Sequence, residues 1–112
     1  MANYLHIVNN VFKALADPTR RRVLELLRKT PMTAGELCEY FPVSKPTMSA
    51  HFAVLREANL ITPEKVGKTI TYRLNLSVLE DALLSFAQVF GIGMGRTLKQ
   101  KGGSRILQRK TT

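Results

Sequence analysis

The spacing of apolar residues changes from helical to alternating and back to helical along this chain. Apolar residues recur every three or four positions in four stretches before residue 60 and in one stretch after residue 76, which predicts five amphipathic helices. Counted from cap to cap, these helices are expected at residues 4–16, 17–30, 33–41, 44–59 and 77–90. Between the last two, Ile70, Tyr72 and Leu74 alternate with polar residues, which predicts a strand with one buried face.

Cap residues support the start of four of these helices. Asp17 is a favourable N-cap and Pro18 is a favourable first helical residue. Residues 33–36 and 77–80 both read Ser/Thr-x-x-Glu, the sequence of a capping box. Ser44 stands where it can cap the fourth helix. These signals predict where each helix begins.

The order of elements predicts a winged helix-turn-helix. Residues 60–62 are expected to form a short extended segment, and residues 64–68 a polar turn around Gly67. Apolar and polar residues alternate over residues 69–74. Together these segments predict a β-hairpin. The third and fourth helices are joined by a short turn, as in a helix-turn-helix, and the hairpin after them fits a wing. We therefore expect a mainly α (α+β) domain over residues 1–92, with the hairpin before its last helix.

The fourth helix carries the pattern that is most informative about function. Met48, Phe52 and Leu55 lie at i, i+4 and i+7 and give it one apolar face. The opposite face has short side chains: Pro46, Thr47, Ser49, Ala50 and Ala53. Such a face can approach DNA base edges closely. An ordinary amphipathic helix would also have such an apolar face, so this helix alone does not predict DNA binding. The hairpin that follows it favours DNA binding.

Basic residues are concentrated near the C-terminal end. Residues 1–92 hold eleven Lys/Arg and eight Asp/Glu, a balance of +3, whereas residues 93–112 hold six Lys/Arg and no acid, a balance of +6. Such a segment is either a solvated, disordered end or an arm that seeks DNA phosphates, and both descriptions can hold together. We expect residues 93–112 to be a flexible basic tail.

Composition disfavours several other classes of protein. No run approaches the roughly 18 apolar residues of a membrane span, the first residues do not resemble a signal peptide, and the single cysteine, Cys38, excludes an internal disulfide framework. There is no nucleophile–base–acid signature, and the glycines at 91–95 follow a helix rather than a strand, which is wrong for dinucleotide binding. We expect a cytoplasmic protein that is not an enzyme.

Four motifs together resemble the ArsR family of winged-helix bacterial repressors. They are KALADPTRRRVLELL at 13–27, MTAGELCEYF at 32–41, SKPTMSAHFAVLREANLI at 44–61 and KVGKTITYRL at 65–74. The stretch from Asn9 also resembles the SdpR type of small autorepressors. The resemblance implies a homodimer that binds an inverted repeat near a promoter and blocks transcription, with an interface made by the first and last helices.

The resemblance and the residue types together assign roles to side chains. We expect Pro46, Thr47, Ser49 and Ala50 to contact base edges, and Ser44, Lys45 and Arg56 to hold phosphates. Lys65, Lys68 and Thr69 are expected to place the wing against the backbone or the minor groove. The expected dimer interface comprises the apolar stripes of the first and last helices: Leu5, Val8, Phe12, Leu79, Leu83, Phe86 and Phe90.

Departures from the family pattern concern metal ligands. Metal-sensing members carry a Cys-x-Cys pair in the third helix, but here Cys38 matches the first position and Tyr40 occupies the second. The last helix has Glu80 and Asp81 but no histidine, and zinc needs about four ligands. We therefore expect no metal and no cofactor, and a structural role for His51.

Several alternatives stay open at this point. A metal- or thiol-responsive repressor would use Cys38, although a small core residue is the favoured interpretation. A winged-helix module for protein–protein contact would dock a partner such as a membrane-bound antirepressor.

Three consecutive arginines stand at the start of the second helix, where cations oppose the helix dipole. A purely local role in that helix is therefore disfavoured. We expect Arg20 to pair with Asp17 or another carboxylate, and Arg21 and Arg22 to face phosphate or solvent.

Overall fold

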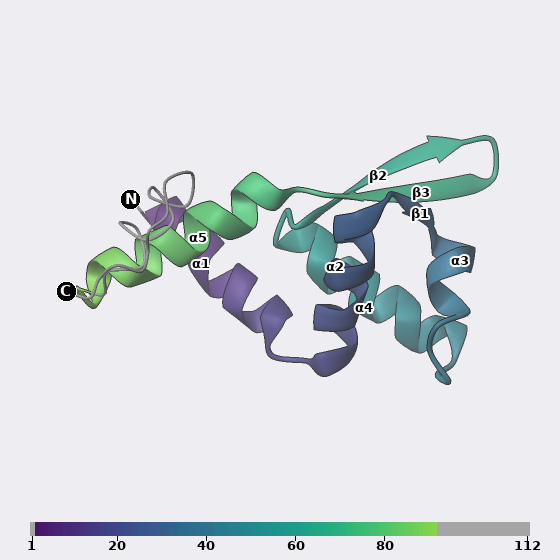
Figure 1. The fold of residues 1–112 in the computed structure, drawn as a ribbon, viewed down its shortest axis with the longest axis horizontal. Coiled ribbons are helices and arrows are strands. Elements are labelled where there is room, and N and C mark those ends of the chain that lie inside the picture. Colours follow the sequence, from purple (N-terminus) through teal and green to yellow (C-terminus); the bar gives the residue numbers. More distant parts are fainter. Residues whose placement is uncertain (1, 92–112) are drawn as a thin grey trace, which may run out of the picture.

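The computed structural model describes residues 2–91 and contains five helices and three short strands (Figure 1). In chain order they are α1 (Ala2–Leu15), α2 (Pro18–Lys29), β1 (Met32–Thr33), α3 (Ala34–Cys38), α4 (Lys45–Glu57), β2 (Ile61–Val66), β3 (Thr69–Leu74) and α5 (Leu76–Val89). The predicted mainly helical winged architecture is confirmed. The predicted tail at residues 93–112 lies outside the described residues.

The sheet is larger than the predicted hairpin. Its strand order is β1-β3-β2, all antiparallel, and Met32 of β1 pairs with Tyr72 of β3. Sequence alone did not reveal β1, because two residues are too few to show an alternating pattern. Pro63 lies in β2, which is an edge strand, where its missing N–H disrupts no second ladder.

The wing hairpin is also tighter than predicted. Val66 pairs with Thr69, so the loop consists of Gly67 and Lys68 alone, and residues 64–66 belong to β2 rather than to the turn. Gly67 has φ +61°, a conformation that glycine adopts without steric cost and that two-residue hairpin loops require. The short loop places Lys68 at the extreme tip of the wing.

The core is formed by residues of all five helices together with Ile61 of β2 and Tyr72 of β3. The predicted apolar face of α4 is confirmed, because Met48, Phe52 and Leu55 are buried. In α1, however, Val11 and Ala14 are the fully buried residues. Of the stripe predicted for this helix, Val8 and Phe12 are only half-buried, and the side chain of Leu5 lies outside the described part.

Most of the predicted caps are present. The Asp17 carboxylate accepts hydrogen bonds from the N–H groups of Thr19 (2.8 Å) and Arg20 (3.2 Å). Thr33 and Glu36 form the complete capping box, although α3 ends at Cys38 rather than at Phe41.

The predicted capping box at residues 77–80 is wrong. Helix α5 begins at Leu76, and Asn75 occupies its N-cap position without a side-chain cap bond. The Nδ2 of Asn75 instead donates to the carbonyl of Asn59 (2.9 Å). This tertiary bond ties the end of β3 to the end of α4, so the helix starts before Ser77 can cap it.

Asn59 ends α4 in the left-handed region, with φ +61°. The N–H of Asn59 donates to the Arg56 carbonyl (2.9 Å) and the N–H of Leu60 to the Leu55 carbonyl (3.0 Å), which is the Schellman arrangement. Asn is the residue other than glycine that most readily adopts this conformation. The motif turns the chain sharply from α4 into the wing.

Candidate nucleic-acid interface

The start of α4 is fixed by a local hydrogen-bond pair. The Ser44 hydroxyl accepts from the Thr47 N–H (3.3 Å) and lies 2.9 Å from the Thr47 hydroxyl, to which it donates. Pro46 stands in the first turn, where no N–H is needed. Both hydroxyls are exposed, so the Thr47 O–H proton remains available to a ligand.

The exposed face of α4 gathers the predicted contact residues. The exposed members are Ser44, Lys45, Pro46, Thr47, Ser49, Ala50 and Arg56. Because Met48, Phe52 and Leu55 hold the other face in the core, these side chains lie together on one surface. That surface has short polar side chains in its centre and cations toward both ends, which suits a groove lined by phosphates.

A cleft lies beside α4, and both Lys45 and Arg56 line it. Its volume is about 340 Å³, and it is lined by residues of α3, α4 and β3, including Cys38, Lys45, Ser49, Arg56 and Tyr72. A terminal guanidinium nitrogen of Arg56 donates to the Tyr72 hydroxyl (3.4 Å). Tyr72 is only 2% exposed, so the ring anchors Arg56 over the cleft. Sequence reasoning missed this link, because no local pattern joins residues sixteen positions apart.

The wing presents cations near its tip. Lys65, Lys68 and Thr69 are exposed. Glu64 and Arg73 pair across β2 and β3, with Nε of Arg73 3.4 Å from the carboxylate. Neither Lys65 nor Lys68 is in an ion pair within residues 2–91, so both charges are available to an anionic partner.

His51 has a structural role, as predicted. Its Nδ1 lies 3.1 Å from a terminal nitrogen of Arg20 and its Nε2 lies 3.9 Å from the Asp17 carboxylate. The side chain is only 15% exposed. A guanidinium donates and never accepts, so Nδ1 is the acceptor and neutral His51 carries its proton on Nε2, facing Asp17.

Of the three consecutive arginines, Arg20 departs from its predicted role. Arg20 binds His51 and backbone carbonyls of α1 rather than a carboxylate partner. Arg21 donates to the Leu15 carbonyl (2.7 Å), and Arg22 pairs with Glu25 (2.6 Å). The departure of Arg20 has a physical cause: the last carbonyls of α1 need donors, and the α1–α2 turn brings α2 back against them. Arg21 and Arg22 are exposed, as expected for side chains that face solvent.

The pKa of Asp17 is lowered from its ordinary value. Desolvation is the largest effect and raises the pKa, but hydrogen bonds from the backbone N–H groups of Arg20 and Thr19 and electrostatic interactions with His51 and Arg20 together outweigh it. Asp17 therefore stays ionised and holds both the start of α2 and the Nε2 side of His51.

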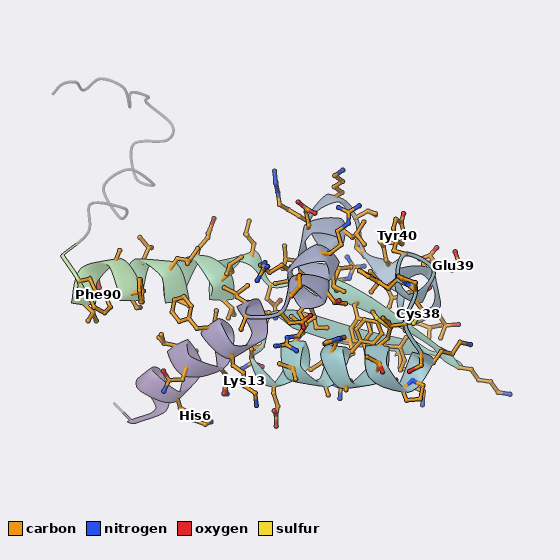
Figure 2. The ribbon with its side chains drawn as sticks, turned by 90° about the horizontal axis from the view of Figure 1, so that it is seen from below. His6, Lys13, Cys38, Glu39, Tyr40 and Phe90 are labelled. Atoms are coloured by element: carbon orange, nitrogen blue, oxygen red, sulfur yellow. The ribbon has the colours of Figure 1, made fainter. Side chains whose placement is uncertain are left out.

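Cys38 and Tyr40 occupy the positions of the family's Cys-x-Cys metal site, and no cluster of metal ligands surrounds them in the described residues. Cys38 is half-buried at the end of α3, and Tyr40 points outward with 54% exposure in the turn after it (Figure 2). Among residues 2–91, no group of three or more His, Cys, Asp or Glu side chains could hold a metal ion. Nor does that part of the chain contain a helix long and apolar enough to cross a membrane.

Comparison with known proteins agrees with this geometry. The helix-turn-helix domain family HTH_20 matches residues 15–64. The transcriptional repressor SdpR of Bacillus subtilis is 47% identical over 76 residues, which span 68% of this chain and 84% of SdpR. The arsenical resistance operon repressor of Staphylococcus aureus is 34% identical, over 68% of this chain and 73% of that repressor.

The chain belongs to the ArsR family. A solved structure described as a possible transcriptional regulator for arsenical resistance superimposes with a TM-score of 0.66 at 31% identity, over 86% of this chain and 98% of that one. An ArsR-family member of this kind is a DNA-binding transcriptional repressor and not an enzyme.

Proposed function

We propose that this ArsR-family repressor binds an inverted-repeat operator as a homodimer, with α4 of each protomer in the major groove. The observation that carries the proposal is the exposed face of α4, where short side chains flanked by cations stand opposite a fully buried face. A helix of this shape fits the major groove, which admits one α-helix. We propose residues 1–92 as the functional unit that binds DNA and dimerises.

Contacts with DNA divide into two kinds in this proposal. Pro46, Thr47, Ser49 and Ala50 read base edges, and Ser44, Lys45 and Arg56 hold phosphates beside them. The cleft between α4 and β3 supports this division, because it gathers Lys45, Ser49 and Arg56 in one groove that a DNA strand can follow. Lys65, Lys68 and Thr69 at the wing tip then contact the neighbouring backbone or minor groove.

Dimerisation is proposed through α1 and α5. These two helices lie side by side at one end of the molecule, away from α3 and the wing tip (Figure 1). Phe90 lies at the end of α5 farthest from Cys38 (Figure 2) and is 64% exposed, and Val89 beside it is 72% exposed. The proposed interface also includes Leu5, Val8, Phe12, Leu79, Leu83 and Phe86. An exposed apolar patch of this kind marks a contact surface.

The proposed repressor works without a metal sensor site or a cofactor. Tyr40 stands where a second thiolate would be needed, and α5 offers no histidine. Release of DNA would then depend on another signal, such as a protein antirepressor. Since its partner is chromosomal DNA, we place the protein in the cytoplasm, and we assign the basic residues 93–112 to non-specific attraction of DNA.

Selection of genomic DNA fragments by the purified protein tests the proposal. Enriched fragments should share an inverted repeat, and footprinting should protect two half-sites about one helical turn apart. Enriched fragments with a single unpaired site would contradict the dimeric part. An absence of salt-dependent duplex binding would contradict the DNA contacts and favour a protein-docking module.

A further inference from the structure

The end of α1, the start of α2 and the middle of α4 meet at the guanidinium group of Arg20. We infer that Arg20 is a positioning residue: through His51 it fixes the angle between the dimerisation helix α1 and the recognition helix α4. The inference rests on the proposed dimeric function, because only in a dimer does that angle set the separation of two recognition helices.

The first half of the link is made to α1. Nε of Arg20 donates to the Ala14 carbonyl (2.8 Å) and one terminal nitrogen donates to the Lys13 carbonyl (2.8 Å). These carbonyls lie in the last turn of α1, beyond the regular i→i+4 bonds of the helix, and the Lys13 carbonyl also accepts from the Ala16 N–H (3.2 Å). A cation at this end is also favoured by the helix dipole. Two parallel bonds from one rigid planar group hold Arg20 in a fixed orientation relative to α1.

The second half of the link is made to α4. The remaining terminal nitrogen of Arg20 donates to Nδ1 of His51 (3.1 Å). His51 lies between Ser49 and Ala50, which belong to the proposed reading face, and Phe52, which is buried in the core. Asp17 holds the same assembly from the other side, since its carboxylate caps α2 and lies 3.9 Å from Nε2. One guanidinium therefore connects the end of α1 to the centre of the recognition helix.

This connection matters because operator reading is a question of spacing. Two recognition helices must meet half-sites about 34 Å apart, and one base pair corresponds to about 3.4 Å along the helix axis. Helix α1 contacts α4 and buries Val11 and Ala14 in the shared core, and apolar contacts are non-directional. The Arg20–His51 bond supplies the directional restraint at this junction.

The test measures the preference for half-site spacing in the full-length protein. Operators with the natural spacing, with one base pair added or removed, and with a single half-site are compared for each variant. Arg20→Met and His51→Leu should each weaken binding to the natural operator about fivefold to tenfold, the worth of one net hydrogen bond. The affinity for a single half-site should stay within about twofold of wild type. The loss of affinity caused by adding or removing one base pair should therefore be smaller in these variants than in wild type.

Rescue separates positioning from mere stability. In His51→Asn the side-chain oxygen is attached to Cγ, as Nδ1 is in histidine, and it can accept from Arg20. This variant should bind like wild type. The double variant Arg20→Met with His51→Leu should lose no more than the larger single loss, since both substitutions remove the Arg20–His51 bond. Arg22→Met, which breaks only an exposed pair on α2, and His6→Leu on α1 serve as controls.

Each affinity is measured well below the variant's melting temperature, so that unfolded protein does not enter the comparison. Equal losses on the natural operator and the single half-site would overturn the inference, because they indicate a local or direct contact. Failure of His51→Asn to restore binding, or additive losses in the double variant, would overturn it too. A wild-type protein without any spacing preference would instead overturn the proposed dimeric function, and the inference with it.

Discussion

Phe12 of α1 and Phe86 of α5 pack with ring centroids 4.9 Å apart, and Phe90 continues the row 4.7 Å beyond Phe86. The first pair joins the two helices within one protomer, so Phe86 serves the fold of the single chain. Phe90 and Val89 lie beyond that contact and are exposed. The outer part of α5 is therefore an exposed apolar surface that is available to the second copy in the proposed dimer.

Phe90→Glu should convert a dimer to a folded monomer. Burying a phenylalanine in an interface is worth about 1.5–3 kcal/mol, and a carboxylate at this position costs further desolvation. Sedimentation should show the monomer, and circular dichroism should show unchanged helix content. Val66→Glu is the matched control, because Val66 is similarly exposed at the wing. Persistence of a dimer in Phe90→Glu at micromolar concentration would move the interface elsewhere.

Asp17→Asn should lower the melting temperature at neutral pH and have no effect in strong acid. Asparagine retains an N-cap acceptor, so the difference reports the charge alone. Because the pKa of folded Asp17 is lowered, the ionised carboxylate stabilises the fold above its ordinary pKa, and that contribution is lost as pH falls through the folded value. Melting curves between about pH 7 and pH 2 measure the difference.

The control for this series is Glu25→Gln, which alters an exposed pair with Arg22 and should shift stability little at any pH. The difference in melting temperature between wild type and Asp17→Asn is compared across this pH range. A difference that stays constant from neutral to strongly acidic pH would show that the charge of Asp17 does not contribute to stability.

Local patterns predicted the elements that local physics determines. The apolar face of α4, the cap at Asp17 and the box at Thr33 each depend on residues within one or two turns, and each is present as predicted. The winged order followed from these elements together. Ser44 was predicted as the N-cap of the fourth helix and Lys68 as part of the turn around Gly67, and both are exposed at those places.

Features that depend on tertiary contact could not be predicted in this way. Strand β1 exists because β3 lies beside it, and Asn75 starts α5 because Asn59 is within reach. Arg20 and Arg21 bind carbonyls of α1 that local spacing does not reveal as neighbours. In each case the partner is brought close by the fold, and the sequence near the residue carries no sign of it.

Lys68→Ala should weaken binding to operator and scrambled DNA alike. Its charge stands at the wing tip, free of ion pairs within residues 2–91, and phosphate contacts carry no sequence information. The slope of log K against log salt should fall by about one unit per protomer. Lys13→Ala on α1, outside the proposed interface, is the control. A loss restricted to operator DNA would assign Lys68 to base reading instead.

Zinc, cadmium and arsenite should leave the operator complex intact at stoichiometric concentrations. Cys38 has no second thiolate two residues away, because Tyr40 stands there. Gel-shift titration with each metal, followed by a chelator, checks this expectation, and Cys38→Ser should behave like wild type. Metal-induced release that the chelator reverses would show that a sensor site exists.

The most direct test of the central claim compares operator and scrambled duplexes over a salt series for Thr47→Val and Ser49→Ala. Valine keeps the shape of Thr47 and its N–H bond to Ser44 while removing the hydroxyl, and Ser77→Ala on α5 is the matched control. Each variant should lose about 1–3 kcal/mol on the operator and almost nothing on scrambled DNA. Equal losses on both duplexes would contradict the assignment of α4 as the element that reads the sequence.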